Sequence, residues 1–243
     1  LDTAAAAERT LLGGVTTVRD VGGWNYVEMA VRDAIGRGIA RGPRMFLAGR
    51  LLSITTSTVE YYPGMYEVAD GADAVRAAAR RQLAKGADLI KVMATGAMLS
   101  SETEDSRAIQ FTLDELKAAV EIAHDNFKHV AAHCHAVRGI HQAVEAGVDS
   151  IELGTFADDD ALRKMPEGRR SATGADDPAG AEVRDLLGGA AELGQHLVGV
   201  LVEPGRVAAE RRVGHGVVRG RSWFADAAEP RMVVLDQRRV VLH

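Results

Sequence analysis

Cysteine is nearly absent from this chain of 243 residues, and because Cys134 stands alone no disulfide can form within the chain. Aromatic residues make up only 5% of the sequence, and no apolar run approaches the roughly 18 residues that a membrane-spanning helix needs. Neither sign of charge dominates, and a net charge of −5 gives no reason to expect nucleic acid as a partner. What remains is the composition of an ordinary globular protein, long enough for one barrel or two smaller domains.

Strand-like and helix-like segments alternate over the first two thirds of the chain. The clearest helix signals are apolar residues at helical spacing before Gly86 and a capping box that begins at Thr112. The strand-like segments are 15–21, 44–48, 88–95, 130–135 and 150–156, and the helix-like segments are 2–12, 28–37, 72–85, 112–123 and 139–146. This alternation is typical of βαβ units around a parallel sheet, which builds either a barrel arc or an open sheet.

A lysine interrupts one of the most apolar of these segments. Lys91 lies inside the run 88–96, which has the near-continuous hydrophobicity of a parallel strand covered on both faces. Lysine is seldom fully buried without a partner, and burial favours loss of its proton. Lys91 is therefore either a structural residue that reaches out of one end of the sheet or a residue that takes part in chemistry.

Two histidines interrupt another strand-like segment. His133 and His135 are two residues apart, so on a strand they point to the same face. A single strand histidine is more often a hydrogen-bonded core residue than a ligand, but a pair that shares a sheet with Lys91 suggests a metal site. Cys134, between them, is either a soft metal ligand or a small core residue, and the second interpretation is favoured.

Five segments in a fixed order carry a resemblance to a known family: 15–23, 41–44, 90–96, 130–135 and 147–152. Together they make the chain similar to the metal-dependent amidohydrolase superfamily, in the branch of imidazolonepropionase-like hydrolases that includes Xaa-Pro and Xaa-Arg dipeptidases. The resemblance covers residues 8–162. It implies a truncated or divergent member of α/β class, with an incomplete (β/α)8 TIM-barrel-like hydrolase domain that holds barrel strands two to six.

The resemblance also implies a site. In the family two divalent metal ions, usually zinc, are bridged by a lysine that carbon dioxide has carboxylated. Lys91 matches that lysine and His133 matches the strand-five imidazole ligand, so both are expected to bind metal and act in catalysis. His135 is expected to act in catalysis or in substrate binding, and Tyr62, in a loop over the site, is expected to contact substrate.

The chain also departs from the family pattern. Leu153 stands where the family has the strand-six histidine, and the His-x-His pair of strand one and the aspartate of strand eight have no counterpart. Two functions from different classes therefore stay open. The first is a metal-dependent hydrolase of amide or peptide C–N bonds in small substrates such as dipeptides, impaired or intact in this chain. The second is a non-catalytic barrel remnant that binds a small ligand or a partner chain.

Composition changes near residue 163. Residues 163–243 contain 12 of the 24 arginines but only one of the five lysines, and we expect a divergent Arg/Gly-rich tail after a partial barrel at 1–162. A remnant of the family's small β-domain is one interpretation of this tail, and its last part, 232–242, predicts a hairpin.

We expect a small-molecule or dipeptide substrate and neither nucleic acid nor a membrane as partner. An incomplete barrel has unpaired sheet edges, and because such edges favour association, a homo-oligomer is a further expected partner. The compartment is undetermined, and would be the cytoplasm if the chain is complete. We expect structural roles for two further sets of charged residues. Arg19 and Asp20 are expected to form an ion pair at the end of a strand, and Glu102, Glu104 and Asp105 are expected to lie in a solvated acidic loop.

Overall fold

The computed structural model describes residues 1–97 and 104–165, together with five short strands further along the chain. The strands of the first two thirds are β1 Thr17–Asp20, β2 Arg44–Leu47, β3 Leu51–Ser53, β4 Tyr66–Val68, β5 Leu89–Met93, β6 His129–Cys134 and β7 Ser150–Leu153. The helices are α1 Asp2–Leu12, α2 Val27–Gly36, α3 Thr58–Tyr61, α4 Ala72–Ala84, α5 Leu113–Asp125, α6 Val137–Ala146 and α7 Asp159–Lys164.

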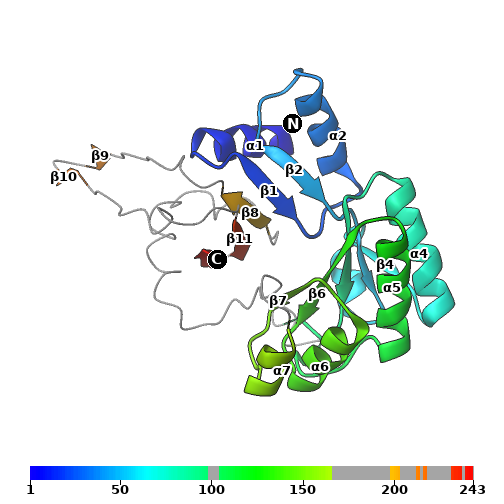
Figure 1. The fold of residues 1–243 in the computed structure, drawn as a ribbon. Helices are drawn as coiled ribbons and strands as arrows, with labels where there is room; N and C mark the ends of the chain where they lie inside the picture. Colours follow the sequence, from blue (N-terminus) through cyan, green and yellow to red (C-terminus); the bar gives the residue numbers. More distant parts are fainter. Residues whose placement is uncertain are drawn as a thin grey trace.

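The strands form a parallel arc with β2 and β3 as its bent element (Figure 1). β1 pairs with β2, and a second sheet has the order β4-β3-β5-β6-β7, with every one of these pairings parallel. β2 and β3 are separated by three residues only, and the amide of Asp88 donates to the carbonyl of Leu47 at 2.7 Å, which brings β2 beside the start of β5. The expected α/β fold with a partial barrel of parallel strands is confirmed.

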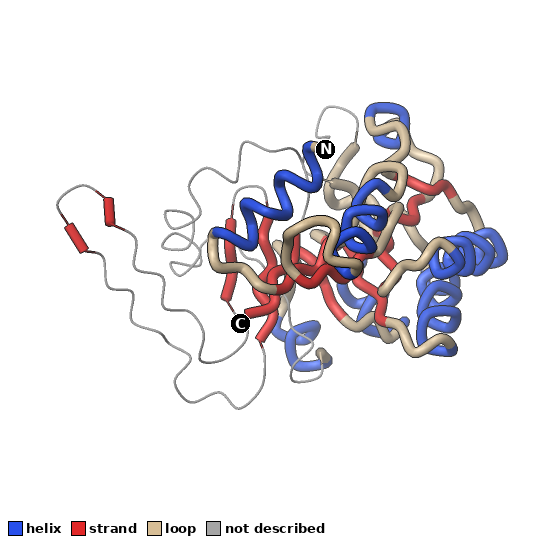
Figure 2. Tube along the Cα trace, turned by 90° about the horizontal axis from the view of Figure 1, so that it is seen from above, coloured by secondary structure: helices blue, strands red, loops and turns tan. Residues whose placement is uncertain are grey.

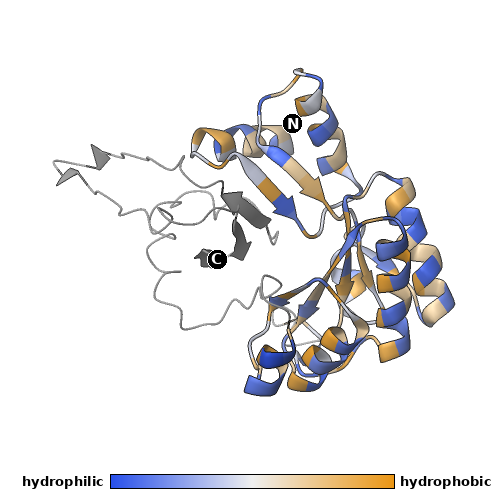
Figure 3. Cartoon of the chain, in the orientation of Figure 1, coloured by the Kyte–Doolittle hydropathy of each residue, from blue (hydrophilic) through white to orange (hydrophobic). Residues whose placement is uncertain are grey.

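Helices cover one face of this arc. α4, α5 and α6 lie against the side chains of β5, β6 and β7 that point outward, and Figures 1 and 2 show these helices along one side of the strands. The apolar core there joins strand residues with helix residues such as Ala79, Leu116 and Ile140. In Figure 3 hydrophilic and hydrophobic residues alternate along these helices. The strand residues of this outer face are Leu52, Ile90, Val92, Val130, Ala132, Cys134 and Ile151.

The opposite side of the strands, here called the inner face, holds the alternate residues, because side chains on a strand alternate between faces. Leu89 and Ala131 pack there with Val21 and Ala48. This small apolar cluster joins β5 and β6 to the ends of β1 and β2. Lys91 and His133 belong to the same alternation, so the two residues expected to bind metal lie on the inner face.

Local sequence explains most element boundaries. The capping box predicted at Thr112 is present, with the Thr112 side chain accepting from the amide of Glu115 and the Glu115 carboxylate accepting from the amide of Thr112. α6 ends at Gly147, whose φ of 87° is left-handed. The strand predicted at 150–156 stops at Leu153 because Leu153 and Gly154 both have positive φ. The short elements β3, β4, α3 and α7 were not predicted, because a hydrophobic periodicity can be recognised only over a longer segment than any of these.

The later strands are β8 Val198–Val202, β9 Arg212–Val213, β10 Gly216–Val217, β11 Arg231–Asp236 and β12 Arg239–Leu242. Each pairs antiparallel: β8 with β1 and β11, β9 with β10, and β11 with β12. The β11–β12 pair confirms the predicted hairpin. Most of the tail lies outside the described residues, and its division from the barrel at residue 163 stays a prediction. None of the described helices is long and apolar enough to cross a membrane.

Gly49 makes the bend between β2 and β3 possible. Its φ is 71°, and a Cβ at this position would lie 2.8 Å from Oε1 of Gln82 and 3.0 Å from Cε of Met29. Its carbonyl accepts from the amide of Gly23 at 2.9 Å. Both the left-handed backbone and the close packing therefore require glycine.

We expect Gly49→Ala to lower the free energy of unfolding by about 1–3 kcal/mol, because it adds backbone strain and a steric contact. Gly36→Ala is the matched control, since a Cβ there meets nothing within 4 Å and alanine favours a helix. Urea unfolding followed by circular dichroism measures both. Equal stability of the two variants would contradict the assignment of Gly49 as the constrained bend.

Candidate active site

The sheet register places the candidate residues in two adjacent rows on the inner face. Met93 of β5 pairs with His133 of β6, which pairs with Glu152 of β7. The second row lies two residues nearer the N-terminal ends of the strands. There Lys91 pairs with Ala131, and Ala131 pairs with Ser150. Paired residues of parallel neighbours point to the same side, so Lys91, His133 and Glu152 share one surface of the sheet.

Lys91 is fully buried, and its Nζ has no hydrogen-bond partner among the described residues. The pKa of Lys91 is lowered to about 8, because burial, assisted by the nearby charge of Arg19, outweighs the opposite effect of the charge of Glu152. The interpretation in which Lys91 reaches out of the sheet into solvent is therefore wrong. At pH 7 about a tenth of this lysine is a neutral amine, far more than for a lysine in water.

The charge of Glu152 is held by a residue from the other end of the arc. Arg19 of β1 donates from one terminal nitrogen to Oε1 of Glu152 at 2.5 Å and from the other to Oγ of Ser150 at 2.9 Å. Ser150 itself donates to Oε1 of Glu152 at 2.8 Å. β1 and β7 are not neighbours in a sheet, so this contact spans the inner face and shows that the arc curls as a barrel wall does.

The pKa of the Glu152 carboxyl is lowered by this arrangement. Burial alone would raise it, but the charges of Arg19 and Lys91 and the hydrogen bonds from Ser150 and Arg19 outweigh burial. The expected Arg19–Asp20 ion pair is a wrong prediction, because consecutive strand residues point to opposite faces and only Arg19 points inward.

The two histidines lie beside Lys91 and are both buried. Burial, with the charge of Lys91, lowers the pKa of His133 well below its ordinary value and that of His135 to about 4. Their rings meet edge to face with centroids 4.7 Å apart. Both imidazoles are therefore neutral near pH 7, and each keeps a nitrogen lone pair.

Hydrogen bonds orient both rings. Nε2 of His133 lies 3.2 Å from the carbonyl of Gly96, and because a carbonyl only accepts, the neutral ring carries its proton on Nε2 and its lone pair on Nδ1. Nδ1 of His135 lies 2.8 Å from Oγ1 of Thr155, and the His135 amide donates to Oγ1 of Thr95 at 2.9 Å. Nε2 of His135 is buried without a partner among the described residues.

Cys134 points the other way. It lies in the outer apolar core with Ala132 and Ile140, and burial raises the pKa of its thiol to about 12. The favoured interpretation of Cys134 as a small core residue agrees with this position, and a thiolate ligand at the site does not.

Tyr62 lies at the end of α3, between two other aromatic rings. Its ring centroid is 6.5 Å from that of Trp24 and 6.4 Å from that of Tyr66. Tyr66 pairs with Leu51 of β3, and it packs against a cluster of Leu51, Met93 and Ala97 on the inner face. Tyr66 therefore lies between Tyr62 and the row that contains Met93 and His133.

The acidic loop is only partly solvated, which corrects the sequence-based expectation. Glu104 accepts from Oγ1 of Thr58 at 3.0 Å and from the amide of Ala97 at 3.2 Å, and it also accepts from the side chain of Gln110. It thus joins the segment after β5 to α3, and sequence periodicity could not show this. Asp105 is exposed and pairs with Arg107, whereas Glu102 lies outside the described residues.

The donor set fits one side of a metal site. Three buried polar atoms of the inner face lack partners among the described residues: Nζ of Lys91, Nε2 of His135 and Oε2 of Glu152. However, no three His, Cys, Asp or Glu residues in the described part of the chain lie close enough together to hold a metal ion. Catalytic zinc usually has three protein ligands, so these residues do not form a complete site by themselves.

Leu153 occupies the strand end where the family resemblance leads one to expect a histidine. Its φ is 82°, a conformation that is a strained outlier for a bulky apolar residue, whereas histidine is enriched there relative to most residues. Strained backbone of this kind is concentrated at functional sites. The side chain of Leu153 therefore does not explain the positive φ of the backbone at the end of β7.

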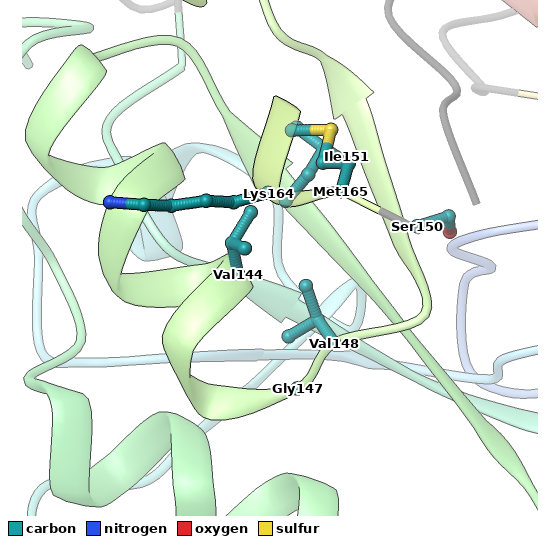
Figure 4. A pocket seen from close by; sticks show the side chains of 7 residues that line it. All are labelled: Val144, Gly147, Val148, Ser150, Ile151, Lys164 and Met165. Carbon is teal, nitrogen blue, oxygen red and sulfur yellow. The ribbon is translucent and has the colours of Figure 1, made fainter. Parts of the chain in front are cut away.

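A small pocket of about 110 Å³ lies elsewhere, between α6, the start of β7 and α7 (Figure 4). Its lining residues are Val144, Gly147, Val148, Ser150, Ile151, Lys164 and Met165. In Figure 4 the ammonium of Lys164 points away from the apolar side chains. Neither Lys91 nor the histidines line this pocket, and Ser150 is the lining residue that also binds Arg19 and Glu152 at the candidate active site.

Comparison with known proteins identifies the family to which the chain belongs. The model of the amidohydrolase family matches residues 2–210, further than the segment 8–162 that the five motifs cover, and the chain belongs to this family. Ochratoxinase from Aspergillus niger is 33% identical over 179 aligned residues, which cover 65% of this chain and 36% of that protein. The chain thus spans little more than a third of its curated relative.

Solved structures agree with the fold. A Xaa-Pro dipeptidase with bound methionine is 38% identical with a TM-score of 0.61, over 66% of this chain and 42% of that one. The structure of A. niger ochratoxinase has a TM-score of 0.62 at 31% identity, over 67% and 42%. A prolidase complexed with N-methylphosphonate-L-proline has a TM-score of 0.58 at 31% identity, over 66% and 42%.

Sequence reasoning placed His133 and His135 on one face and Lys91 on another strand of the same sheet, but it missed Glu152, which lies between these residues and Arg19. Glu152 was visible as an acidic residue in an apolar strand, two positions after Ser150, and the period of two placed it inward. Its partner on β1, 133 positions away, carries no local signal.

Removing Arg19 should leave the carboxylate of Glu152 buried without its strongest partner. We expect Arg19→Met to lower the free energy of unfolding by about 3–5 kcal/mol, measured by urea unfolding. Adding Glu152→Gln should restore part of this loss, since the buried charge is then gone. Arg107→Met, which breaks an exposed pair, should change stability little, and a similar loss in that control would contradict the burial argument.

Asp20 predicts a pH dependence of stability. Burial, together with the nearby charge of Glu28, raises the pKa of Asp20 from 3.8 to about 7, although the Gly22 amide donates to its Oδ1 at 2.9 Å. A raised carboxyl pKa stabilises the fold at low pH, and this contribution is lost as pH rises from about 4 to about 7.

Asp20→Asn keeps the acceptor for Gly22 and removes the charge. We expect the variant to gain stability relative to the native chain as pH rises across this window, by as much as about 4 kcal/mol, since each pKa unit corresponds to about 1.4 kcal/mol. Urea unfolding at pH 4, 6 and 8 measures the difference. Asp125→Asn, at the exposed end of α5, is the control, and parallel profiles for native and Asp20→Asn protein would contradict the prediction.

Proposed function

We propose that this protein is a metal-dependent hydrolase of amide or peptide C–N bonds in small substrates such as dipeptides. The observation that carries the proposal is the buried, unpartnered amine of Lys91 beside two neutral histidines on the inner face of a barrel arc. Perturbed titratable groups that gather at one place in a fold mark candidate active sites. Family membership supplies the reaction class.

Lys91 contributes first through its amine. Because burial lowers its pKa to about 8, the neutral form is available to attack carbon dioxide. A bond forms between Nζ and the carbon, one proton leaves the nitrogen to water, and the product is a carbamate with two oxygen donors. An ammonium group has no lone pair and cannot act in this way.

His133 and His135 contribute lone pairs and orientation. The carbonyl of Gly96 fixes the tautomer of His133 so that Nδ1 is the free donor. The contact of Thr155 with Nδ1 of His135 leaves Nε2 of that ring unpartnered. We assign the first histidine to metal binding and the second to contact with the substrate or its proton.

Lys91 and His133 would hold one side of a divalent metal site, with zinc as the expected ion. A bound divalent ion lowers the pKa of water toward neutrality and polarises the scissile carbonyl. Glu152, held by Arg19 and Ser150, keeps a negative charge near Lys91 and orients that side of the site.

The relatives support small substrates with a C–N bond. They include a Xaa-Pro dipeptidase, a prolidase and an ochratoxinase. Dipeptides are therefore the first substrates to test on this chain.

One observation favours a second function, a non-catalytic remnant that binds a small ligand or a partner chain. Leu153 offers no lone pair at the position where the family resemblance implies a histidine ligand, although the backbone there keeps its positive φ. The two functions differ in what restoring that ligand would do.

Metal content and dipeptide hydrolysis separate them. After supply of zinc and bicarbonate, we expect the native protein to retain well over about a tenth of an equivalent of zinc and to hydrolyse members of a dipeptide panel. Lys91→Ala should lower the activity by about 100-fold or more, as loss of a group that acts on the transition state does. Emission spectroscopy measures the metal, and chromatography of released amino acids measures turnover.

Leu153→His is the informative gain-of-function variant. It should raise zinc retention and activity without loss of stability, because histidine tolerates the positive φ at this position better than leucine. Leu113→His, at a partly buried position on α5 away from the inner face, is the matched control and should raise neither. A protein that neither retains zinc nor hydrolyses any dipeptide, with or without Leu153→His, would favour the non-catalytic remnant.

A further inference from the structure

The peptide group between Gly96 and Ala97 lies between the candidate active site and the loop that follows β5. Its carbonyl accepts from Nε2 of His133 at 3.2 Å, and its N–H donates to Oε2 of Glu104 at 3.2 Å. A peptide group is planar and this one is trans, so its carbonyl and its N–H point in opposite directions and cannot turn independently. The carboxylate of Glu104 therefore sets the direction from which the carbonyl of Gly96 meets the ring of His133.

The loop after β5 folds back over Gly96 and so brings Glu104 to this peptide. The amide of Gly96 donates to the carbonyl of Ala108 at 3.0 Å, which ties the start of the loop to its end. A Cβ on Gly96 would overlap the carbonyl oxygen of Asp105 and would lie 2.8 Å from Cγ of Glu104. The close approach of Glu104 therefore requires glycine at position 96.

The carboxylate of Glu104 is itself held by neutral donors from three parts of the chain. Besides the amide of Ala97, it accepts from Oγ1 of Thr58 in α3 at 3.0 Å and from the side chain of Gln110, just before α5. Thr58 and Gln110 are both buried. Hydrogen bonds to a charged acceptor are stronger than those between neutral groups, so Glu104 is a fixed point rather than a mobile surface carboxylate.

Loss of this carboxylate would change the environment of the 96–97 peptide. Ala97 is buried and packs with Leu51 and Met93, and a buried N–H without an acceptor is costly. The peptide would then turn toward another partner, and its carbonyl would leave Nε2 of His133. Hydrogen bonds to the second nitrogen of a metal-binding histidine are what orient its ring.

We propose that Glu104 is a positioning residue, whose carboxylate holds the 96–97 peptide so that the carbonyl of Gly96 fixes the ring of His133 with Nδ1 as the free donor. The metal-binding role of His133 rests on the proposed function. The hydrogen bonds from Glu104 to the ring need no metal, so orientation of the ring and binding of metal can be tested separately.

Nuclear magnetic resonance of the histidine rings provides a readout that depends neither on zinc nor on turnover. The full chain is prepared with isotope-labelled histidine and treated with a chelator, and His133→Gln identifies the signal of His133 among the eight histidines. Long-range proton–nitrogen correlation shows which ring nitrogen carries the proton, and magnetisation transfer from water measures the exchange of that proton. In the native chain we expect a protonated Nε2 with slow exchange, because the ring is buried and its N–H is bound to Gly96.

Glu104→Ala should speed this exchange by about tenfold or more, the factor that loss of one hydrogen bond to a charged group implies. Glu104→Gln should stay within about threefold of the native rate, because its amide oxygen still accepts from Ala97 and the side chain of Gln110 can turn to accept as well. Asp105→Ala is the matched control. It removes a carboxylate from the same loop, but the side chain of Asp105 is exposed and pairs with Arg107, so the exchange should not change.

Thr58→Val covers the case in which Glu104→Ala fails to fold. It removes one donor to the carboxylate of Glu104 and keeps the shape of the side chain, and it should speed the exchange by about 3- to 10-fold. Zinc affinity, measured by competition with a chromophoric chelator, is the second readout. It should fall about 10- to 100-fold in Glu104→Ala, as is typical when a contact that orients a metal ligand is removed, and should not change in Asp105→Ala.

Native exchange of the His133 proton in Glu104→Ala, even with a loss of stability, would overturn the proposal. Equal effects of Asp105→Ala and Glu104→Ala, or native exchange in Thr58→Val where Glu104→Ala does not fold, would also overturn it. Faster exchange in Glu104→Ala that Glu104→Gln avoids, in a chain that retains no zinc, would support the positioning role and contradict only the proposed function. Zinc-dependent dipeptide hydrolysis with native exchange in both Glu104→Ala and Thr58→Val would support the function and contradict the positioning role.

Discussion

The contact between Arg19 and Glu152 is the constraint on which the rest of the described structure depends. It joins the first and last strands of the arc across the inner face, where the two strands share no backbone hydrogen bond. A buried carboxylate is costly unless a cation and further donors satisfy it, so the chain must curl until Arg19 of β1 reaches Glu152 and Ser150 of β7. The same curvature encloses Lys91 and removes it from solvent.

Enclosure decides the chemical state of the site. Burial lowers the pKa of Lys91 and of both histidines, so the two imidazoles are neutral near pH 7 and the amine of Lys91 loses its proton more readily than it does in water. Glu152 stays ionised because Arg19 and Lys91 outweigh its desolvation. The proposed divalent-metal site rests on these lone pairs next to one fixed negative charge, and Leu153 adds no lone pair to them.

The rim of the arc shows a different physical feature, which is backbone strain held by neighbouring structure. Asn25, Tyr26 and Leu153 have positive φ without being glycine, and each lies in or at the edge of a loop that follows a strand of the arc. Hydrogen bonds to Gly64 and Arg50 hold the first of these loops. Such rigid loops on a strand scaffold are where α/β barrels place substrate contacts.

The sequence by itself determined the alternation of strands and helices, the capping box at Thr112, and the shared face of His133 and His135, because each follows from a period or a motif within a few residues. It also placed Lys91 in a buried strand. Only the tertiary structure decided that Arg19 binds Glu152 rather than interacting with Asp20, that Glu104 joins two loops, and that Tyr62 lies between Trp24 and Tyr66. These contacts join residues far apart in the chain, and no local pattern records which distant segments the curl of the arc will bring together.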